Sequence, residues 1–409
     1  MQRRTFPACL LVLVGLFAAC AGKGAPAAGV VIVVDVPLAR AGLLAQQIVR
    51  GTQLAAAQIN AAGGVQAGNR RVRLGVRVLD SEASPERSAA NVREAVRLGA
   101  VAVLDEGTGV DASWQIANAA GVPIGIVYQG GTSLVDPVKR PNVFRIAPTD
   151  RGVSFRLAEY LVPKGVKIAI LHDDSTYGSG GGAALAQAFA RNRSSVTTTI
   201  AVAASATDVS AEVLRARRSG ATALLVWARP SIVALAIREA RSTRWTVPIY
   251  AATSGGDPIV RQQLSDHPDW VDGLTFASSR LTSEKGPGPF NRFRSAYEKR
   301  FGVEKVGVRS GGKEVVQPPD EAMYSYDFVL VLSKAIEAAG SATPGPALVK
   351  QMADVDVQGA NGDERSFNEV NHEGVVDDDV FFAVLRDMVW IPVKDDALSA
   401  SLPAVRQTI

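Results

Sequence analysis

Short apolar runs alternate with longer amphipathic stretches along most of the chain. Val30 to Val36 and Ile124 to Val127 are apolar runs of the kind found in parallel strands that are covered on both faces. Between them lie segments in which apolar residues recur at helical spacing, the first from about Gly42 to Asn60. Repeated strand–helix–strand units predict a parallel sheet with helices on both faces.

Turn and cap residues mark the ends of these elements. The run Ile59-Asn60-Ala61-Ala62-Gly63-Gly64-Val65 ends the first helix, because its two glycines supply the left-handed backbone of a helix stop. A strand from Val72 to Asp80 is expected next. Ser84-Pro85-Glu86 reads as an N-cap, a first-turn proline and a first-turn acid, and Gly99 ends that helix.

The alternation pauses at Phe144 to Asp150 and restarts with a strand from Val166 to Leu171. Two successive α/β halves joined by an extended segment predict two similar lobes with a hinge. The further elements predicted along both halves are strands at 101–104, 196–202, 223–226 and 247–251, and helices at 112–120, 182–191, 208–218 and 232–241.

The last part of the chain is less regular. Phe290 to Arg300 is predicted to be a helix, and Tyr324-Ser325-Tyr326-Asp327 opens another helix that Gly340 closes. Between them, Gly307 to Gln317 carries polar residues and two adjacent glycines, so we expect an exposed loop there.

The first residues form an export signal. Arg3 and Arg4 precede a short apolar core from Leu10 to Ala19, and small residues stand before Cys20. We therefore expect residues 1–19 to be a lipoprotein signal peptide and Cys20 to be the lipidated new N-terminus, with a plain cleavage nearby as the alternative. Residues 20–29 are then a flexible spacer.

Composition excludes several kinds of chemistry. The only cysteines are Cys9 and Cys20, so the mature domain has no disulfide. Removing Arg3 and Arg4 lowers the formal charge from +4 to +2, which does not indicate nucleic-acid binding. The three histidines show no ligand-like spacing, so we expect no metal. The longest later apolar stretch, 221–237, is broken by Arg229-Pro230, so we expect no membrane span.

The glycine run before the strand ending at Asp80, the Tyr324 to Asp327 segment and the turn from Phe367 to Gly374 occur in an order and spacing similar to one family. From about Val30 to Val393 the chain resembles the branched-chain amino acid (leucine/isoleucine/valine)-binding proteins of ABC transporters, which have the type I periplasmic binding protein fold. The resemblance implies an α/β fold class, with two similar doubly wound parallel-sheet lobes joined by three crossovers. Its N-terminal lobe would comprise 30–147 and 277–375, and its C-terminal lobe 148–276 and 376–409.

Two loops of the first lobe are candidates for the binding site, because ligands bind beyond the carboxyl ends of strands in such sheets. Gly107-Thr108 and Gly130-Gly131-Thr132 combine glycines with a hydroxyl before a helix, so their amides could face an anion. The resemblance implies that these loops hold the α-carboxylate of an amino acid. The alternative is that both threonines only cap helices.

The second lobe supplies the other candidates. The resemblance implies that the ring of Tyr177 lines the pocket and that Trp227 or Arg229 faces it, a surface arginine being the alternative. At Ser254 the family carries a glutamate that pairs with the ligand's ammonium group. Asp257 lies nearby but reads as the N-cap before Pro258, so an acid without an α-amino group also fits.

One glycine-rich stretch invites a different interpretation. Gly178 to Ala183 matches a dinucleotide-binding pattern, but it does not follow its strand directly and no acidic residue ends the next strand. We therefore expect only a flexible, glycine-rich entry to a helix.

These observations together predict an exported substrate-binding lipoprotein of an ABC importer. It would capture a small carboxylate-bearing solute, an amino acid or related organic acid, by lobe closure. No nucleophile elbow or phosphate-binding loop is present, so we expect neither an enzyme nor a cofactor. The expected partners are the small-molecule ligand, the permease subunits and the membrane that holds the lipid anchor, and we expect a periplasmic or cell-surface monomer. A ligand-sensing receptor component with the same fold, not coupled to transport, is the alternative.

Overall fold

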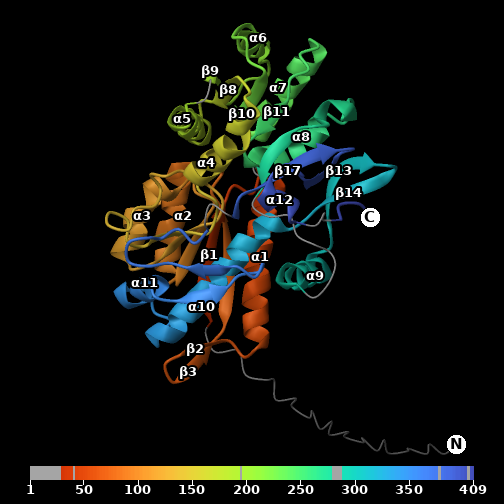
Figure 1. Ribbon diagram of the computed structural model, residues 1–409. Coiled ribbons are helices and arrows are strands. Elements are labelled where there is room, and N and C mark those ends of the chain that lie inside the picture. Colours follow the sequence, from red (N-terminus) through yellow and green to blue (C-terminus); the bar gives the residue numbers. More distant parts are fainter. Residues whose placement is uncertain (1–28, 40–41, 194–195, 279–287, 376–378, 403–405) are drawn as a thin grey trace, which may run out of the picture.

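Two parallel β-sheets, one in each of two lobes, organise the chain (Figure 1). The structure is a computed structural model that describes residues 29–39, 42–193, 196–278, 288–375, 379–402 and 406–409. The predicted signal peptide, Cys20 and nearly all of the spacer lie outside these residues. None of the described helices is long and apolar enough to cross a membrane.

The first lobe contains a five-stranded parallel sheet in the order β4-β1-β5-β6-β7. Helices α1, α10 and α11 pack on one face, and α2 and α3 on the other, which confirms the predicted doubly wound arrangement. The elements of this lobe are β1 (Val30–Val36), α1 (Gly42–Ala61), β4 (Leu74–Asp80), α2 (Pro85–Arg97), β5 (Ala102–Asp105), α3 (Val110–Ala119), β6 (Ile124–Ile126), β7 (Val143–Arg145), α9 (Pro289–Phe301), α10 (Asp320–Ala339) and α11 (Pro346–Met352).

The second lobe contains a seven-stranded sheet in the order β18-β17-β12-β11-β10-β8-β9. Strands β8 to β12 run parallel, and β17 and β18 add an antiparallel edge. Its elements are α4 (Asp150–Leu161), β8 (Ile168–Asp173), α5 (Thr176–Arg191), β9 (Val196–Val202), α6 (Ser210–Arg218), β10 (Ala223–Trp227), α7 (Pro230–Ser242), β11 (Ile249–Ala251), α8 (Pro258–Gln263), β12 (Thr275–Ser278), β17 (Phe381–Arg386), β18 (Val389–Pro392) and α12 (Ala397–Ala400).

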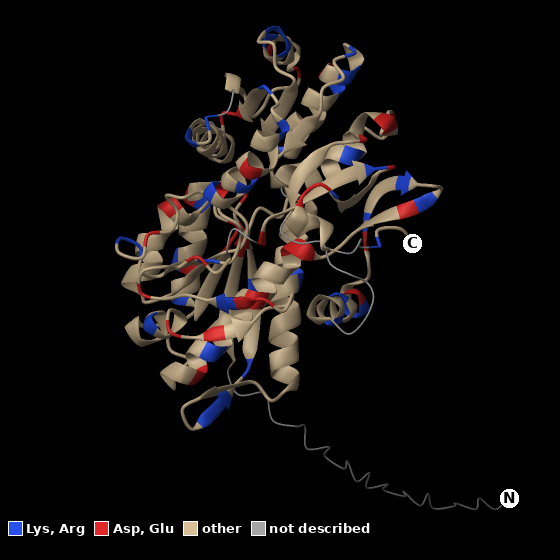
Figure 2. Cartoon of the chain, viewed as in Figure 1, with Lys and Arg blue, Asp and Glu red and all other residues tan. Residues whose placement is uncertain are grey.

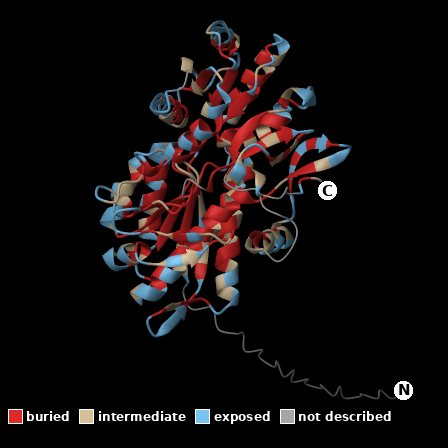
Figure 3. Cartoon of the chain, viewed as in Figure 1, coloured by how far each residue is buried: buried red, intermediate tan, exposed pale blue. Residues whose placement is uncertain are grey.

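Burial follows the layers that the apolar runs predict. Figure 3 shows both sheets buried and the outward faces of the helices exposed. Separate apolar clusters occupy the two faces of each sheet, with Ile48 and Phe328 on one face of the first sheet and Val92 and Val103 on the other. Each lobe therefore has a core of its own.

Several predicted boundaries are confirmed at the level of hydrogen bonds. The Ser84 hydroxyl accepts from the Arg87 N–H, as an N-cap should. Helix α1 ends at Ala61, and Gly63 and Gly64 have positive φ angles of 102° and 84°. The Gly64 N–H donates to the Ile59 carbonyl and closes the turn. A hairpin of β2 (Val65–Ala67) and β3 (Arg70–Val72), which the sequence did not predict, then precedes β4, so the predicted strand from Val72 to Asp80 is interrupted at Arg73.

The predicted exposed loop at 307–317 is wrong. These residues form most of a hairpin of β13 (Glu304–Ser310) and β14 (Lys313–Gln317), in which alternate residues of β13 are buried. Val306, Val308 and Val315 join the core of the second lobe, although the hairpin lies between two helices of the first. The predicted residue division between the lobes stays a prediction, and this hairpin is one segment of 277–375 that packs against the other lobe.

Two helices also differ from the sequence prediction. Helix α4 begins at Asp150, where the sequence pattern predicts no element, and Thr149 is its N-cap. Helix α5 begins at Thr176 rather than Gly182, so the glycines after Tyr177 lie inside the helix and are not a flexible entry. Gly181 and Gly182 lie directly against the side chains of Trp227 and His172, which a Cβ atom would not permit.

A buried ion-pair cluster joins α10 to the segment that follows α11. Arg365, 1% exposed, donates from Nε to Asp327 Oδ2 at 3.0 Å and from Nη1 to Asp379 Oδ2 at 3.1 Å. Its Nη2 donates to Asn361 Oδ1 at 3.1 Å. Burial raises the pKa of Asp327 to about 6 even beside this guanidinium, so the buried carboxyl group depends on the positive charge of Arg365 to stay ionised.

An Arg365→Met substitution should therefore lower the free energy of unfolding by about 3–5 kcal/mol, because two buried carboxyl groups lose their cation. Urea denaturation followed by circular dichroism measures this loss. Lys334→Met is the control, since Lys334 pairs with Glu337 on an exposed part of α10 and should change stability by less than about 1 kcal/mol. Equal losses for the two variants would contradict the assignment.

Candidate functional site

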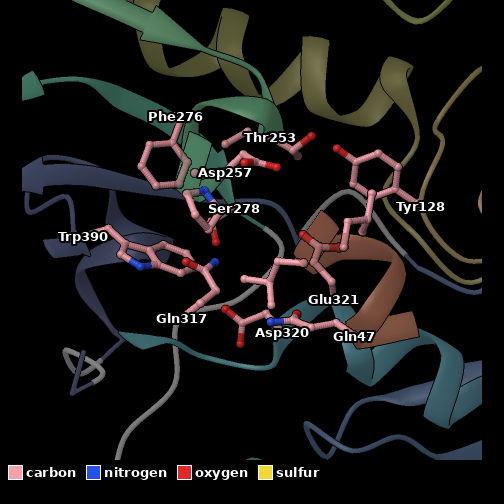
Figure 4. A pocket seen from close by; sticks show the side chains of 15 residues that line it. Gln47, Tyr128, Thr253, Asp257, Phe276, Ser278, Gln317, Asp320, Glu321 and Trp390 are labelled. Atoms are coloured by element: carbon pink, nitrogen blue, oxygen red, sulfur yellow. The ribbon is translucent and has the colours of Figure 1, made fainter. Parts of the chain in front are cut away.

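Two adjoining cavities lie between the lobes, and we call them together the cleft. They share Tyr128, Thr253 and Glu321 as lining residues. The first is also lined by Leu43, Leu44, Gln47, Gly256, Asp257, Pro258, Phe276, Ala277, Ser278, Gln317, Asp320 and Trp390 (Figure 4). The second is also lined by Gly130, Pro148, Asp150, Val153, Tyr177, Trp227 and Tyr324.

Sheet topology places these residues at one junction. Tyr128 follows β6 of the first lobe, Thr253 follows β11 of the second, and Trp227 is the last residue of β10. The carboxyl ends of parallel strands meet at the same edge of a sheet, which is where α/β folds bind ligands. The first turns of α1 and α10 close the cleft on the side of the first lobe, as Leu43 and Glu321 show.

Aromatic rings form a large part of the cleft wall. The ring centroids of Tyr177 and Trp227 are 5.9 Å apart, and those of Phe276 and Trp390 are 5.6 Å apart. Within the described part of the chain, the Tyr177 hydroxyl and the Trp227 Nε1 have no hydrogen-bond partner although both atoms are buried. Burial raises the pKa of Tyr177 above its usual range, so its hydroxyl is a neutral donor.

Carboxyl groups from both lobes face the same space. Burial, reinforced by the nearby charge of Asp257, raises the pKa of Glu321 to about 7. Burial likewise raises the pKa of Asp150 to about 6, with Arg145 acting in the opposite sense. Figure 2 shows acidic residues on both sides of the junction between the lobes. Among the described residues that line the two cavities there is no lysine, arginine or histidine.

The predicted anion-binding loop after β5 is occupied by carboxylates of the protein itself. The Gly107 N–H donates to Asp105 Oδ1 at 2.6 Å, and the Thr108 N–H donates to Glu106 Oε1 at 3.2 Å. Gln129 Nε2 donates to the Thr108 hydroxyl at 2.7 Å and to Glu106 Oε2 at 3.1 Å. Neither Gly107 nor Thr108 lines the two cavities.

The loop after β6 contributes one predicted residue to the cleft. Gly130 lines the second cavity beside Asp150. The Gly131 carbonyl instead accepts from Arg145 at 3.0 Å, and Thr132 is exposed. The fully buried Arg145 also donates to the Gln129 carbonyl at 2.9 Å and forms an ion pair with Glu373 at 2.8 Å. Arg145 therefore fixes the loop from behind the cavity wall.

In the second lobe, Tyr177 and Trp227 line the second cavity, and Arg229 and Ser254 lie outside both cavities. Arg229 is exposed, and its main-chain N–H donates to Asp173 Oδ2 at 2.6 Å. Ser254 is buried behind Thr253, and its hydroxyl has no hydrogen-bond partner among the described residues. Asp257 caps α8 as predicted, because its Oδ1 accepts from the Ile259 N–H at 2.8 Å, and it also lines the first cavity.

Sequence reasoning missed several lining residues. Tyr128 directly follows a predicted strand, so the rule that selected Gly130 could have selected it as well. Glu321 stands three residues before the aromatic segment that opens the predicted helix, and nothing in that pattern indicates a cavity. Gln47 and Trp390 come from a helix and an edge strand distant in sequence, and only the tertiary fold brings them together.

Comparisons with known proteins agree with this architecture. A family model described as periplasmic binding protein matches residues 38–387. No curated protein sequence matches the chain significantly. Among solved structures, a type 1 periplasmic binding protein from Bordetella pertussis aligns with a TM-score of 0.77 at 21% identity, covering 90% of this chain and 100% of that one.

Two further solved structures carry ligands. The branched-chain amino acid transporter substrate-binding protein of Streptococcus pneumoniae, in complex with isoleucine, aligns with a TM-score of 0.73 at 18% identity, covering 89% of this chain and 98% of that one. An ABC transporter solute-binding protein from Rhodopseudomonas palustris, in complex with benzoate, aligns with a TM-score of 0.72 at 15% identity, covering 90% and 96%. At these identities the likeness establishes the fold.

Close packing of α5 against Trp227 provides a test of the cavity wall. A Gly181→Ala substitution places a methyl group inside the van der Waals envelope of the indole and should cost about 1–3 kcal/mol of unfolding free energy. Gly180→Ala is the matched control, because its added carbon would have Asp150 Oδ2 at 3.9 Å as its nearest neighbour. Alanine should be neutral or up to about 1 kcal/mol stabilising there. Thermal denaturation of both variants compares them, and a stable Gly181→Ala protein would contradict this packing.

Proposed function

Because the chain belongs to the periplasmic binding protein family, we propose that it is the solute-binding component of an ABC importer and captures a small solute in the cleft. The observation that carries this proposal is that residues of both lobes line one continuous binding space, as Glu321 and Asp257 do. The members of this family are binding proteins rather than enzymes, and they are located in the periplasm.

Binding would act by closing the lobes. Tyr128 and Glu321 belong to the first lobe, and Thr253, Asp257 and Trp227 to the second. A solute that contacts both groups stabilises the closed arrangement, because only that arrangement makes both sets of contacts. The closed form would then present both lobes to the permease subunits.

Three residues predicted from the sequence fit this role directly. Gly130, Tyr177 and Trp227 line the second cavity and supply backbone, a phenol and an indole to a ligand. The roles of Gly107, Thr108, Gly131, Thr132, Arg229 and Ser254 stay predictions. The Gly107 and Thr108 amides already hold the carboxylates of Asp105 and Glu106, which argues against a ligand carboxylate at that loop.

Lobe closure is tested by small-angle X-ray scattering. The purified chain is first screened by thermal denaturation against small organic cations, zwitterions and anions, and each stabilising solute is then added at saturation. A solute at a hundred times its Kd should stabilise the protein by about 2.7 kcal/mol and reduce the radius of gyration. A stabilising solute that leaves the radius unchanged would contradict closure.

The proposed lipid anchor is tested separately. A Cys20→Ser variant should appear in the soluble extracytoplasmic fraction and lack the acylated N-terminal peptide in mass spectrometry, because a serine cannot form the thioether that carries the lipid. Cys9→Ser is the matched control, since Cys9 precedes the expected cleavage point and its substitution should leave the protein membrane-bound. An acylated Cys20→Ser protein would contradict this site.

A further inference from the structure

We propose that the cleft takes a small organic cation, an amine without a carboxylate, whose charged nitrogen lies between Glu321 of the first lobe and Asp257 of the second. This inference deepens the proposed function and rests on it. The ligand class differs from the carboxylate-bearing solute predicted from the sequence, because the walls of the cleft carry carboxylates where a carboxylate ligand would need cations.

Three acidic side chains line the first cavity. Glu321 and Asp320 enter it from the start of α10, and Asp257 enters it from the loop before α8 (Figure 4). Like charges that approach one another in a partly desolvated space disfavour ionisation, and a cation between them removes that penalty. Among the described residues, the basic group that faces Asp257 is Arg261, and it is already engaged: it donates to Gln317 Oε1 at 2.6 Å and to the Met388 carbonyl at 3.2 Å.

A buried amide supplies an independent observation. Gln47 lines the same cavity and is 1% exposed. Its Nε2 donates to the Pro318 carbonyl at 3.4 Å, whereas its Oε1 has no hydrogen-bond partner within the described residues. An amide oxygen only accepts, and a buried acceptor without a donor destabilises the protein. An ammonium N–H is the donor that this oxygen and the adjacent carboxylates can share.

Aromatic rings complete the arrangement. Tyr128, Phe276 and Trp390 line the first cavity together with the acids. The negative face of an aromatic ring attracts an organic cation, most strongly for tryptophan, and does so even where the cation has no N–H to donate. The carboxylates, the Gln47 oxygen and the aromatic faces of the first cavity are all complementary to a positive charge.

The pH dependence of binding follows from Glu321. The groups that line the cleft with it are Asp150, Asp257, Asp320, Tyr128, Tyr177 and Tyr324, and Arg261 faces Asp257 from α8. The pKa of Glu321 lies at about 7 in the ligand-free protein. A cation binds the ionised form, so its affinity should rise about tenfold from pH 6 to pH 8, and the proton should leave on binding.

Isothermal titration calorimetry of the purified chain tests the inference with four probes: putrescine, choline, leucine and benzoate. We expect binding of at least one of the two cations and no binding of benzoate. Glu321→Gln should weaken cation binding at least tenfold at pH 8 and remove most of its pH dependence between pH 6 and pH 8. Glu337→Gln, at the exposed far end of α10, is the matched control and should bind as the unmodified chain does.

Two further variants separate the cleft from a general loss of structure. Asp257→Asn keeps a side chain that can cap α8 and should still lower the affinity for the cation severalfold. Gln47→Met removes the amide oxygen that lacks a donor and keeps a side chain of similar volume. It should also weaken cation binding severalfold, without lowering the melting temperature. Both are titrated with the cation that binds the unmodified chain.

The inference is overturned if neither cation binds, if benzoate binds, or if Glu321→Gln binds the cation as tightly as the unmodified chain. Leucine binding without cation binding would also overturn it, because the carboxylate would then be accepted. A failure of this kind leaves the proposed function standing when any solute of the wider screen still compacts the protein in scattering. Absence of compaction with every stabilising solute is the separate result that opposes the proposed function itself.

Discussion

The geometry of the cleft depends on the hydrogen bonds and the ion pair that the guanidinium of Arg145 makes. The guanidinium is fully buried at the end of β7, and Nε and Nη2 hold the two carboxylate oxygens of Glu373 at 2.8 and 2.9 Å. Its remaining donors bind the carbonyls of Gln129 and Gly131. A buried cation needs all of these acceptors, so one side chain holds the first sheet, the loop carrying Tyr128 and Gly130, and a late segment of the chain in one arrangement.

Hydrogen-bond satisfaction also differs between the two sides of the cleft. On the side of the first sheet, the Gly107 and Thr108 amides that could receive a ligand carboxylate already donate to Asp105 and Glu106, and the Thr108 hydroxyl accepts from Gln129. On the side that faces the second lobe, the Gln47 oxygen has no hydrogen-bond partner among the residues that the structure describes, and burial raises the pKa of Glu321. Satisfied groups make the wall rigid, and unsatisfied groups determine which ligand the wall favours.

Much of the fold could be predicted from the sequence because local signals and global topology agree. Ser84 caps α2, Gly340 closes α10, and β9 runs from Val196 to Val202, as predicted. The failures have local causes. Gly307 and charged residues concealed the period-two burial of β13, and the glycines after Tyr177 concealed a helix that packs closely on Trp227.

The site was less predictable than the fold. The rule that ligands bind beyond strand ends selected Gly130, Tyr177 and Trp227, which do line the second cavity. It also selected Thr108, which lies outside both cavities and whose hydroxyl accepts a hydrogen bond from Gln129 Nε2. Whether a loop amide is free for a ligand depends on which side chain reaches it, and that is decided by packing between segments far apart in sequence. The hairpin of β13 and β14 adds a mechanical consequence: it packs with the second lobe while α10, only two residues further on, belongs to the first. The two residues between them are Pro318 and Pro319, whose rings fix φ. In the lobe closure that we propose, this connection between the hairpin and α10 can turn about few bonds, so it restricts the path along which the lobes move.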